Sequence, residues 1–472
     1  MDEQELIHKM KAQAVARKLW ERGDTIIVAV SGGPDSVALL DLLHRIQDDE
    51  GLQIIAAHVD HGFRGIESAS EAETVRRFAE KLGIPCESVF IDLPGYIEET
   101  GMNPQAAARE KRYDFLHRIA RKHGARRIAL GHHADDQAET VLMRILRGTG
   151  MSGLAGMTFS RSEKNVQLIR PLLRINKTAL EEYCRARGLT VTDDSSNRKR
   201  DYTRNRVRLD LMPVLRNYNP QLTDSLVRLS DIAAEEDDWM ESEAREAFRR
   251  LVVVEADGCR LERGALLGLH VALQRRLIKL ILIHMGMEKE TTPFDTVESM
   301  REAAREDAAS TWRIDAGGGI RFTREYDNLR FWRGEALVPG SYRYELEVAA
   351  SRLYIAEAGI TLSLTVEQAS VATKPAGRDE AVFDADRLAF PLVARNRLPG
   401  DRMRVLGLNG TKKVQDMFVD ERIPPSRREL MPLLADAAGD IVWIPGVRRG
   451  EAAQVTEVTR QVLRIRAFTD GS

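Results

Sequence analysis

The hydrophobic pattern of the first 150 residues alternates between a strand period and a helix period. Short β-branched runs that end in glycine or polar residues predict buried strands, and apolar residues at helical spacing separate them. The predicted strands lie at 24–30, 52–59, 88–91 and 127–130, and the predicted helices at 36–45, 71–82, 104–123 and 136–146. This alternation predicts an α/β fold whose doubly wound parallel sheet binds ligands at the carboxyl ends of its strands.

The alternation ends near Pro213, and a different pattern follows. Two periodic stretches predict helices, two later stretches predict antiparallel strands, and a segment of mixed charge is a candidate linker. These stretches are 222–250 and 262–286 for helices, 311–333 and 341–365 for strands, and 366–381 for the linker. We therefore expect a catalytic domain at 1–212, a mainly helical plus β middle domain at 213–380 and a small α+β C-terminal domain at 381–472.

Composition narrows the class of protein. Of the 472 residues, 43% are hydrophobic and 30% are charged, which is typical of a globular protein. No apolar run approaches the roughly 20 residues that cross a bilayer, and the acidic start is not a secretory signal. Cys86, Cys184 and Cys259 stand far apart, so neither a zinc ribbon nor a disulfide framework is indicated. We expect a cytoplasmic protein that has no membrane partner.

The segment Ser31-Gly-Gly-Pro-Asp-Ser36 joins the first predicted strand to its helix. Glycines let the backbone approach phosphate oxygens, and the helix N-terminus offers free N–H groups. The hydroxyl groups of Ser31 and Ser36 can donate to phosphate, and Ser36 can also cap the helix. Asp35 can reach a Mg²⁺ ion that bridges phosphate oxygens. The segment therefore predicts an ATP–Mg²⁺ site, although a tight turn that binds nothing is the alternative.

Two common nucleotide motifs are absent from this turn. It lacks the Gly-Lys-Ser/Thr of a P-loop and the G-x-G-x-x-G of dinucleotide-binding folds. Without a lysine at the terminal phosphates, transfer of AMP with release of pyrophosphate is more plausible than terminal phosphoryl transfer.

Residues 131–139, Gly-His-His-Ala-Asp-Asp-Gln-Ala-Glu, begin at the end of another predicted strand. The acids lie near a helix N-terminus, where the helix dipole stabilises them. His132 can stabilise a developing charge, and Asp136 and Glu139 can bind Mg²⁺ or a substrate ammonium group. The alternative is an acidic helix cap with solvated histidines.

A third segment, His58 to Gly62, also lies at a predicted strand end. It can form a wall for the adenine or gate the site, and a polar strand end without a ligand is the alternative.

The net charge of −2 does not indicate a nucleic-acid partner, so local basic clusters decide the question. Residues 197–208 combine six basic side chains with Tyr202, and arginine with an exposed aromatic ring is typical of contacts with unpaired RNA. A second group of basic residues between 395 and 428 fits a module that grips an RNA backbone. For both, a solvated charged surface is the alternative.

Several motifs occur in the chain order of a known family. The turn at 31–36 matches the S-G-G-x-D-S loop of the PP-loop, or N-type ATP pyrophosphatase, superfamily. It is followed by V-D-H-G-F-R, G-H-H-A-D-D-Q-A-E-T, L-R-G-T-G-M-S-G-L-A-G-M, R-P-L-L and D-D-S-S-N…R-N-R-V-R. The chain thus resembles the bacterial tRNA(Ile)-lysidine synthetases over about residues 20–215, with a looser match over 398–428.

This resemblance implies an ATP-dependent ligase that acts in two steps. ATP adenylates the C2 oxygen of the wobble cytidine in the isoleucine tRNA with a CAU anticodon, and free L-lysine then displaces AMP. The product, lysidine, changes the codon and amino-acid specificity of the tRNA from Met to Ile. Lysine must attack as the free amine, although its reference pKa is about 10.4. Asp136 and Glu139 are both candidates to bind the lysine or to accept its proton.

The resemblance also implies roles for particular residues. The expected catalytic residues are Asp35, His132, Asp136, Glu139 and Arg206, with Asp35 as the Mg²⁺ ligand. The expected ATP-binding residues are Ser31, Gly32, Gly33, Pro34, Asp35, Ser36, His58, Arg112 and Gly131. The expected RNA-binding residues are Arg109, Arg198, Lys199, Arg200, Arg204, Arg208, Arg402, Lys412, Lys413 and Arg422. The middle part is expected to help place the anticodon and the C-terminal part to hold the acceptor stem, and a homodimer is possible.

Three other functions fit part of the sequence. A PP-loop tRNA thiolase needs cysteines for sulfur or a cluster, and three isolated cysteines argue against it. A GMP synthetase carries a glutaminase domain, for which we find no Cys-His pattern. A non-catalytic RNA-binding protein gated by nucleotide would bind ATP without turnover.

Overall fold

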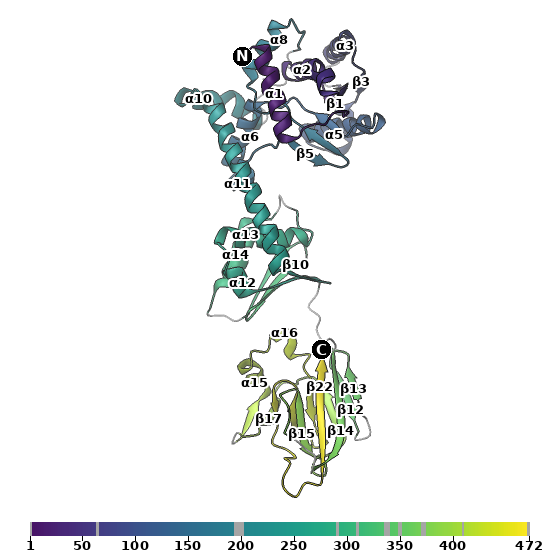
Figure 1. Cartoon of the computed structure of the whole chain (residues 1–472), viewed down its shortest axis with the longest axis vertical. Helices are drawn as coiled ribbons and strands as arrows, with labels where there is room; N and C mark the ends of the chain where they lie inside the picture. Colours follow the sequence, from purple (N-terminus) through teal and green to yellow (C-terminus); the bar gives the residue numbers. More distant parts are fainter. Residues whose placement is uncertain are drawn as a thin grey trace. The chain divides into compact units, whose positions relative to one another are not determined.

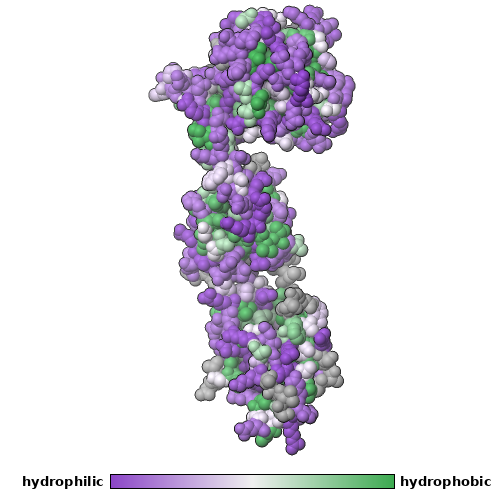
Figure 2. Space-filling view, in the orientation of Figure 1, coloured by the Kyte–Doolittle hydropathy of each residue, from purple (hydrophilic) through white to green (hydrophobic). Residues whose placement is uncertain are grey.

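The computed structural model describes residues 2–62, 66–192, 203–288, 292–307, 311–334, 340–347, 352–369, 374–407 and 410–469 (Figure 1). They form two compact units, Met1–Glu241 and Ser242–Ser472, and each unit is considered by itself. In the view of Figure 2 most of the visible surface is hydrophilic. None of the helices in the described ranges is both long and apolar enough to cross a bilayer.

The first unit contains a six-stranded sheet in the order β3-β2-β1-β4-β6-β5. The strands are β1 Thr25–Ala29, β2 Gln53–Asp60, β3 Cys86–Phe90, β4 Arg127–Ala129, β5 Ser160–Glu163 and β6 Val166–Ile169. Five strands pair in parallel, as predicted, and only the edge strand β5 is antiparallel. The chain order reverses beside β1, which has β2 on one side and β4 on the other. Crevices at such switch points are where open α/β sheets bind ligands.

Helices cover both faces of this sheet. They are α1 Glu3–Arg17, α2 Pro34–Glu50, α3 Ile66–Lys81, α4 Leu93–Thr100, α5 Pro104–Lys122, α6 Ala134–Leu146, α7 Met151–Leu154, α8 Lys177–Ala186, α9 Thr203–Arg206, the π-helical turn η2 Val207–Leu211, and α10 Met212–Tyr218. Strand β1 shows why two faces are filled. Ile26 and Val28 pack in the core that includes α1, α2 and α8, whereas Ile27 packs in the core of α5.

Helix α11, Leu222–Leu251, confirms the helix predicted over 222–250. The second unit then begins with a five-stranded antiparallel sheet in the order β7-β8-β11-β10-β9. Its elements are β7 Val253–Glu255, β8 Gly258–Glu262, α12 Arg263–Leu267, α13 Val271–His284, α14 Phe294–Arg305, β9 Thr311–Gly317, β10 Ile320–Glu325 and β11 Asn328–Arg333. The helix predicted over 262–286 is thus two helices, and Gly268 is the C-cap of the first.

The rest of the second unit is rich in short strands. Its elements are β12 Arg343–Leu346, β13 Arg352–Ile355, β14 Ile360–Gln368, β15 Glu380–Asp384, β16 Leu392–Arg395, β17 Arg402–Arg404, β18 Thr411–Lys413, α15 Val414–Asp420, α16 Pro425–Arg428, β19 Leu433–Ala435, β20 Ile441–Ile444, β21 Arg448–Arg449 and β22 Gln461–Thr469. They form sheets in the orders β12-β16-β19-β20-β21 and β13-β14-β22-β15, with a separate pair β17-β18.

This pairing corrects the predicted boundary at 380/381. Strands β12 and β14 precede it, yet they pair with β16 and β22, which follow it. Apolar residues from both sides, such as Leu362 and Phe383, also share one core. The predicted linker at 366–381 likewise contains the end of β14 and the start of β15. The boundary was misplaced because Pro375 and Gly377 mark a turn within a sheet rather than a link between domains.

Candidate active site

The glycine loop between β1 and α2 is shaped to receive an anion. Gly32 has a φ of 93°, which glycine adopts without strain. Helix α2 begins at Pro34 with Gly33 as its N-cap, and no side chain caps its first N–H groups. Ser36 is not the predicted helix cap. Its hydroxyl lies inside the first turn, where it accepts from the Ser31 N–H at 3.1 Å and donates to the Gly33 carbonyl at 3.0 Å.

The end of β4 lies directly against this loop. A Cβ on Gly131 would be 3.2 Å from the backbone nitrogen of Ser36 and 3.3 Å from the carbonyl oxygen of Asp35. Thr192 contacts the loop from elsewhere, because its backbone N–H donates to the Gly32 carbonyl at 2.9 Å. The two sequence motifs therefore meet, as the predicted parallel sheet requires.

A buried histidine connects the two motifs. His133 is 2% exposed, and its Nε2 lies 3.5 Å from an Asp35 carboxylate oxygen and 3.4 Å from one of Asp136. His133 also caps α6, because its Nδ1 accepts from the Asp136 N–H while the Asp136 carboxylate accepts from the His133 N–H. Burial opposes a charge on His133, but the carboxylates of Asp136 and Asp35 outweigh burial and raise its pKa.

The preceding residue, His132, has the opposite electrostatic character. Burial lowers the pKa of His132 to about 3, although the Asp136 carboxylate acts against that shift. Nearby guanidinium groups, that of Arg170 first among them, lower the pKa further. The Nδ1 atom of His132 is buried without a hydrogen-bond partner among the described residues. The two adjacent histidines therefore differ in charge, with His132 neutral and His133 inclined to protonate.

Asp136 and Glu139 form a carboxylate pair on the first turns of α6, and they are 8% and 2% exposed. Arg208 donates from Nε to Glu139 at 2.6 Å and from Nη2 to Asp136 at 3.0 Å. Arg204 contacts the same two carboxylates, both at 2.9 Å. Burial would raise the pKa of Asp136, but His133 and these guanidiniums lower it to about 2. Asp136 therefore stays ionised at neutral pH.

These contacts bear on two of the predicted residue roles. Arg204 and Arg208 were expected to bind RNA, but here they hold the carboxylates of the site. Arg206, which was expected to be catalytic, lies between them on the exposed side of α9, and the structure shows no carboxylate contact for it. The spacing explains this result, because residues four apart share a helix face and the residue midway does not.

The PP-loop domain model matches residues 4–215, and the TilS substrate C-terminal domain model matches residues 392–466. The tRNA(Ile)-lysidine synthase of Geobacillus kaustophilus is 37% identical over 446 residues, which cover 94% of this chain and 95% of the relative. The chain belongs to the tRNA(Ile)-lysidine synthase family.

Other proteins of the tRNA(Ile)-lysidine synthase family are similar to this chain. The protein of that name from Bacillus subtilis is 35% identical and is matched over 91% of this chain and 90% of its own length. A solved TilS C-terminal domain is 30% identical, covers 28% of this chain and 100% of its own, and has a TM-score of 0.26. The predicted family, enzyme class and fold class are confirmed.

The other predicted ATP-binding residues lie around the same strand ends. The His58 ring on β2 makes a 2.8 Å hydrogen bond with the Val30 carbonyl, and burial lowers the pKa of His58. Arg112 on α5 is half-buried, and burial lowers its pKa. Arg109, one turn earlier, is exposed and lies over the Tyr113 ring at 4.6 Å. No carboxylate partner is found for either arginine in the described part of the chain.

The predicted RNA-binding residues have different outcomes. Arg198, Lys199 and Arg200 lie outside the described residues. Arg402 and Lys413 are exposed, and the strand register places them opposite each other on β17 and β18. Lys412, on the same pair of strands, is held by Asp420. Arg422, beyond α15, is exposed and has a φ of 53°.

One residue of the segment 131–139 has a role that the sequence did not predict. Gln137 is fully buried, and its Nε2 donates to the carbonyls of Ala155 and Met157 and to the Ser230 hydroxyl. Its Oε1 accepts from the Met157 N–H at 2.7 Å. The glycine-rich segment after α6 is thereby fixed to the helix that carries Asp136. The sequence did contain a signal for this role of Gln137. The residue lies between two acids at the start of a helix, and a glycine-rich segment follows that helix.

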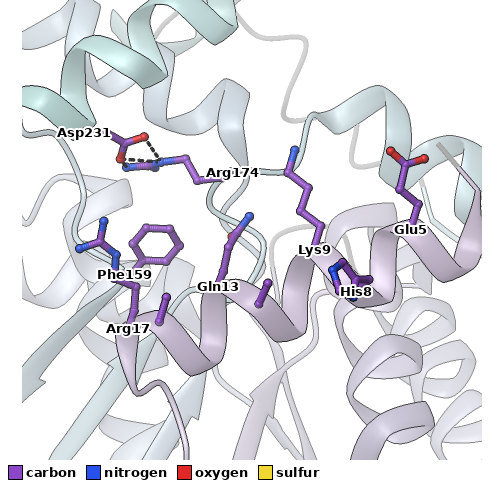
Figure 3. Close-up of a pocket in the computed structure, with 10 residues that line it drawn as sticks. Glu5, His8, Lys9, Gln13, Arg17, Phe159, Arg174 and Asp231 are labelled. Carbon is purple, nitrogen blue, oxygen red and sulfur yellow. Dashed lines mark hydrogen bonds and ion pairs between the residues drawn. The ribbon is translucent and has the colours of Figure 1, made fainter.

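A separate groove of about 580 Å³ runs along α1, outside this site (Figure 3). Phe159 lies on its wall between two guanidiniums, with Arg17 at 5.6 Å and Arg174 at 4.9 Å from the ring centre. Arg174 is also paired with Asp231 on α11. Because the groove contains none of the family motifs and its charges are mixed, we assign it no role.

The site fits one hard cation beside a phosphate. The Asp35 Oδ1 atom is buried without a hydrogen-bond partner among the described residues. No group of three or more metal-ligating side chains is found in the same part of the chain. Mg²⁺ commonly takes only one or two carboxylates and completes its shell with phosphate and water. Asp35 therefore suits Mg²⁺ that arrives with ATP.

Proposed function

We propose that this protein joins lysine to the wobble cytidine of the isoleucine tRNA with a CAU anticodon, at the expense of ATP. The C2 oxygen of the base attacks the α-phosphate of ATP and pyrophosphate leaves; the ε-amine of free lysine then attacks C2 and displaces AMP. The observation that carries this proposal is the position of His133 between Asp35 of the glycine loop and Asp136 of α6, which brings an anion site close to the carboxylate pair. The reaction needs both at once.

The glycine loop supplies the nucleotide half of this chemistry. Free N–H groups at the start of α2, with the hydroxyl groups of Ser31 and Ser36, hold the phosphates. Asp35 holds Mg²⁺, which neutralises phosphate charge when bound. His133, which lies between Asp35 and Asp136, keeps the carboxylate groups of the two motifs at a fixed distance.

The α6 carboxylates supply the lysine half. Because the pKa of Asp136 is about 2, this carboxylate is a weak base and a permanent anion. We therefore assign Asp136 and Glu139 to binding the α-ammonium group of lysine, while the ε-ammonium group loses its proton to water before the free amine attacks. His132 stays neutral, since its pKa is about 3, so it adds no positive charge that would repel the incoming ammonium.

The partners follow from this reaction. The RNA is the isoleucine tRNA and the second substrate is free L-lysine. We expect the reaction to take place in the cytoplasm, where tRNA, ATP and lysine occur together. Formation of a homodimer is a further possibility, and sedimentation of the protein with and without tRNA measures it.

One assay tests the function. The purified protein is incubated with ATP, radiolabelled lysine and a transcript of the isoleucine tRNA, and label in RNA is measured together with AMP and pyrophosphate. We expect one AMP for each lysine incorporated. The elongator methionine tRNA, which shares the CAU anticodon, is the control and should take up no label. Release of ADP, or label that does not depend on ATP, would refute the proposal.

Asp35→Asn tests the metal assignment within that assay. The amide is a poorer Mg²⁺ ligand, so we expect lysine incorporation to fall at least 100-fold while affinity for tRNA stays within twofold. Raising the Mg²⁺ concentration should recover part of the activity. Full activity of this variant at ordinary Mg²⁺ concentration would remove Asp35 from the metal site.

A further inference from the structure

The sheet of β7 to β11 has one face on which arginines gather. Strand pairing places Arg260 opposite Arg330, Arg330 opposite Thr323, and Thr323 opposite Arg313, in one row across four strands. The next row along the sheet places Trp332 opposite Arg321. Because side chains in a pleated sheet alternate between faces, these side chains project from the same side. We name this side the outer sheet face.

The two faces of this sheet have different surroundings. On the inner face, Phe322 and Phe331 are buried and pack with Ile281 of α13 and Met300 of α14. On the outer sheet face, Arg260, Arg313 and Arg321 are exposed, and Arg330 and Trp332 are half-buried. Helices α13 and α14 therefore pack against the inner face of this sheet.

The arginines of the outer sheet face are not all neutralised. Arg260 pairs with Glu255, and Arg330 contacts Glu255 and Asp257. Arg313 and Arg321 have no carboxylate partner among the described residues. Acids share this face, because the strand register places Asp315 opposite Arg321 and puts Glu262 and Glu325 on the same side. The guanidiniums that an anion can contact are therefore those of Arg313 and Arg321.

An indole group lies among these charges. The Nε1 of Trp332 donates to the Thr323 hydroxyl at 2.9 Å, which ties the ring to the neighbouring strand. The guanidinium carbon of Arg321 is 5.3 Å from the ring centre. On the other side, Trp332 faces Gly258, where a Cβ would lie 2.0 Å from the Phe331 carbonyl oxygen. The absence of a side chain at Gly258 leaves the indole uncrowded on that side.

We propose that the outer sheet face binds unpaired nucleotides of the tRNA, with a base stacked on Trp332 and phosphates at Arg313 and Arg321. Sheets that combine aromatic rings with arginine are a general solution for unpaired RNA, because every base has a flat face that can stack. The exposed cations suit the polyanionic backbone. This inference rests on the proposed function, since it takes the substrate to be a tRNA.

The test uses the full-length protein and two variants of the face. Arg313→Gln with Arg321→Gln removes the two unpaired charges, and Trp332→Leu removes the stacking surface. Arg305→Gln is the charge-matched control, because Arg305 is an exposed arginine on α14, which packs against the inner face. The probes are the tRNA transcript, its isolated anticodon stem–loop and a fully paired RNA duplex of equal length. Thermal unfolding of each variant confirms that it is folded.

We expect the double arginine variant to bind the stem–loop about tenfold more weakly. The logarithmic salt dependence of its affinity should be shallower by about 1 to 2, since each lost phosphate contact removes roughly 0.7–0.9. Trp332→Leu should weaken binding of the stem–loop by about tenfold and of the duplex by less than twofold. Arg305→Gln should leave both affinities unchanged.

Two outcomes overturn the inference. One is an affinity of the folded double variant that equals that of Arg305→Gln. The other is a Trp332→Leu variant that loses the stem–loop and the duplex equally, which would mean that no base stacks there. Failure of the wild-type protein to bind or modify tRNA would instead refute the proposed function, and the wild-type arm of the same assay reveals it.

Discussion

Two groups of arginines in this protein show opposite uses of the same side chain. Arg204 and Arg208 are partly buried, and each contacts both Asp136 and Glu139. Arg313 and Arg321 stand on a solvent-facing sheet without a carboxylate partner in the described chain. The first group orders the acids to which we assign lysine binding, and the second is available to a large anion. Local density of arginine in a sequence does not distinguish these uses, whereas the partner of each guanidinium does.

The strongest test of the buried group is Arg208→Met. Loss of this guanidinium leaves two buried carboxylates with Arg204 as their one remaining guanidinium partner in the described chain, so we expect about 3 kcal/mol lower free energy of unfolding. Lysine incorporation should fall at least 100-fold, because the acids lose their fixed orientation. Denaturant unfolding and the labelling assay measure the two effects.

The matched control for that variant is Arg208→Lys. It keeps the charge but loses the double contact, so it should recover much of the stability and little of the activity. If Arg208→Met were as stable and active as the wild type, the contrast between the two arginine groups would fail.

The pH dependence of stability tests the charges around the buried arginines, Arg204 and Arg208. The pKa of His133 is raised in the folded state, so its contribution is fully present below its unfolded pKa of about 6.5 and is lost as pH rises through the folded pKa. His133→Asn keeps a good helix cap but removes the titrating charge. The stability advantage of the wild type over this variant should therefore be larger at pH 6 than at pH 9.

Asp136 acts in the opposite pH range. Its folded pKa of about 2 means that its contribution is present above its unfolded pKa of about 3.9 and is lost as pH falls toward 2. Asp136 stays ionised at both pH 6 and pH 9. The difference in unfolding free energy between these two pH values therefore does not include the protonation of Asp136 and reports on His133. An advantage that grew with rising pH would contradict the assigned proton on His133.

The smallest expected effect belongs to Arg206→Ala. Arg206 is exposed between two paired arginines, so we expect less than a twofold change in the rate of lysine incorporation. The measurement is a single-turnover rate with saturating tRNA, in parallel with Arg208→Met. A loss of rate comparable to that of Arg208→Met would mean that Arg206 is catalytic. It would also show that the carboxylate partners of an arginine do not reveal its role.

Much of the site was predictable because parallel strands bring their carboxyl ends to one edge. The glycine loop and the segment from Gly131 to Glu139 each follow a strand, so their meeting required only the sheet order. The partners of the acids were less accessible. Arg204 and Arg208 lie more than 60 positions from Glu139 in the chain, and only the packed structure shows that they turn inward. The helical spacing could have indicated this difference, since it places Arg206 on another face than Arg204 and Arg208.

The domain boundary failed for a related reason. A turn within a sheet and a link between domains carry the same prolines and glycines, and strand pairing alone tells them apart. Strand β22 decides the matter, because it lies between β14 and β15 in its sheet. Such pairing joins residues about 100 positions apart, beyond the reach of local pattern.

The amide of Gln137 has a consequence for how this enzyme family can vary. One side chain provides two donors and an acceptor to the backbone of residues 155–157 and reaches Ser230 as well. A glutamate there would have the same shape but no donor for the two carbonyls. The segment is restricted from its own side as well, because Gly156 has a φ of 64° and a Cβ on it would lie 2.5 Å from the Gln137 amide nitrogen. Neither the anchor nor this glycine can therefore change without the other, and we expect the two to vary together.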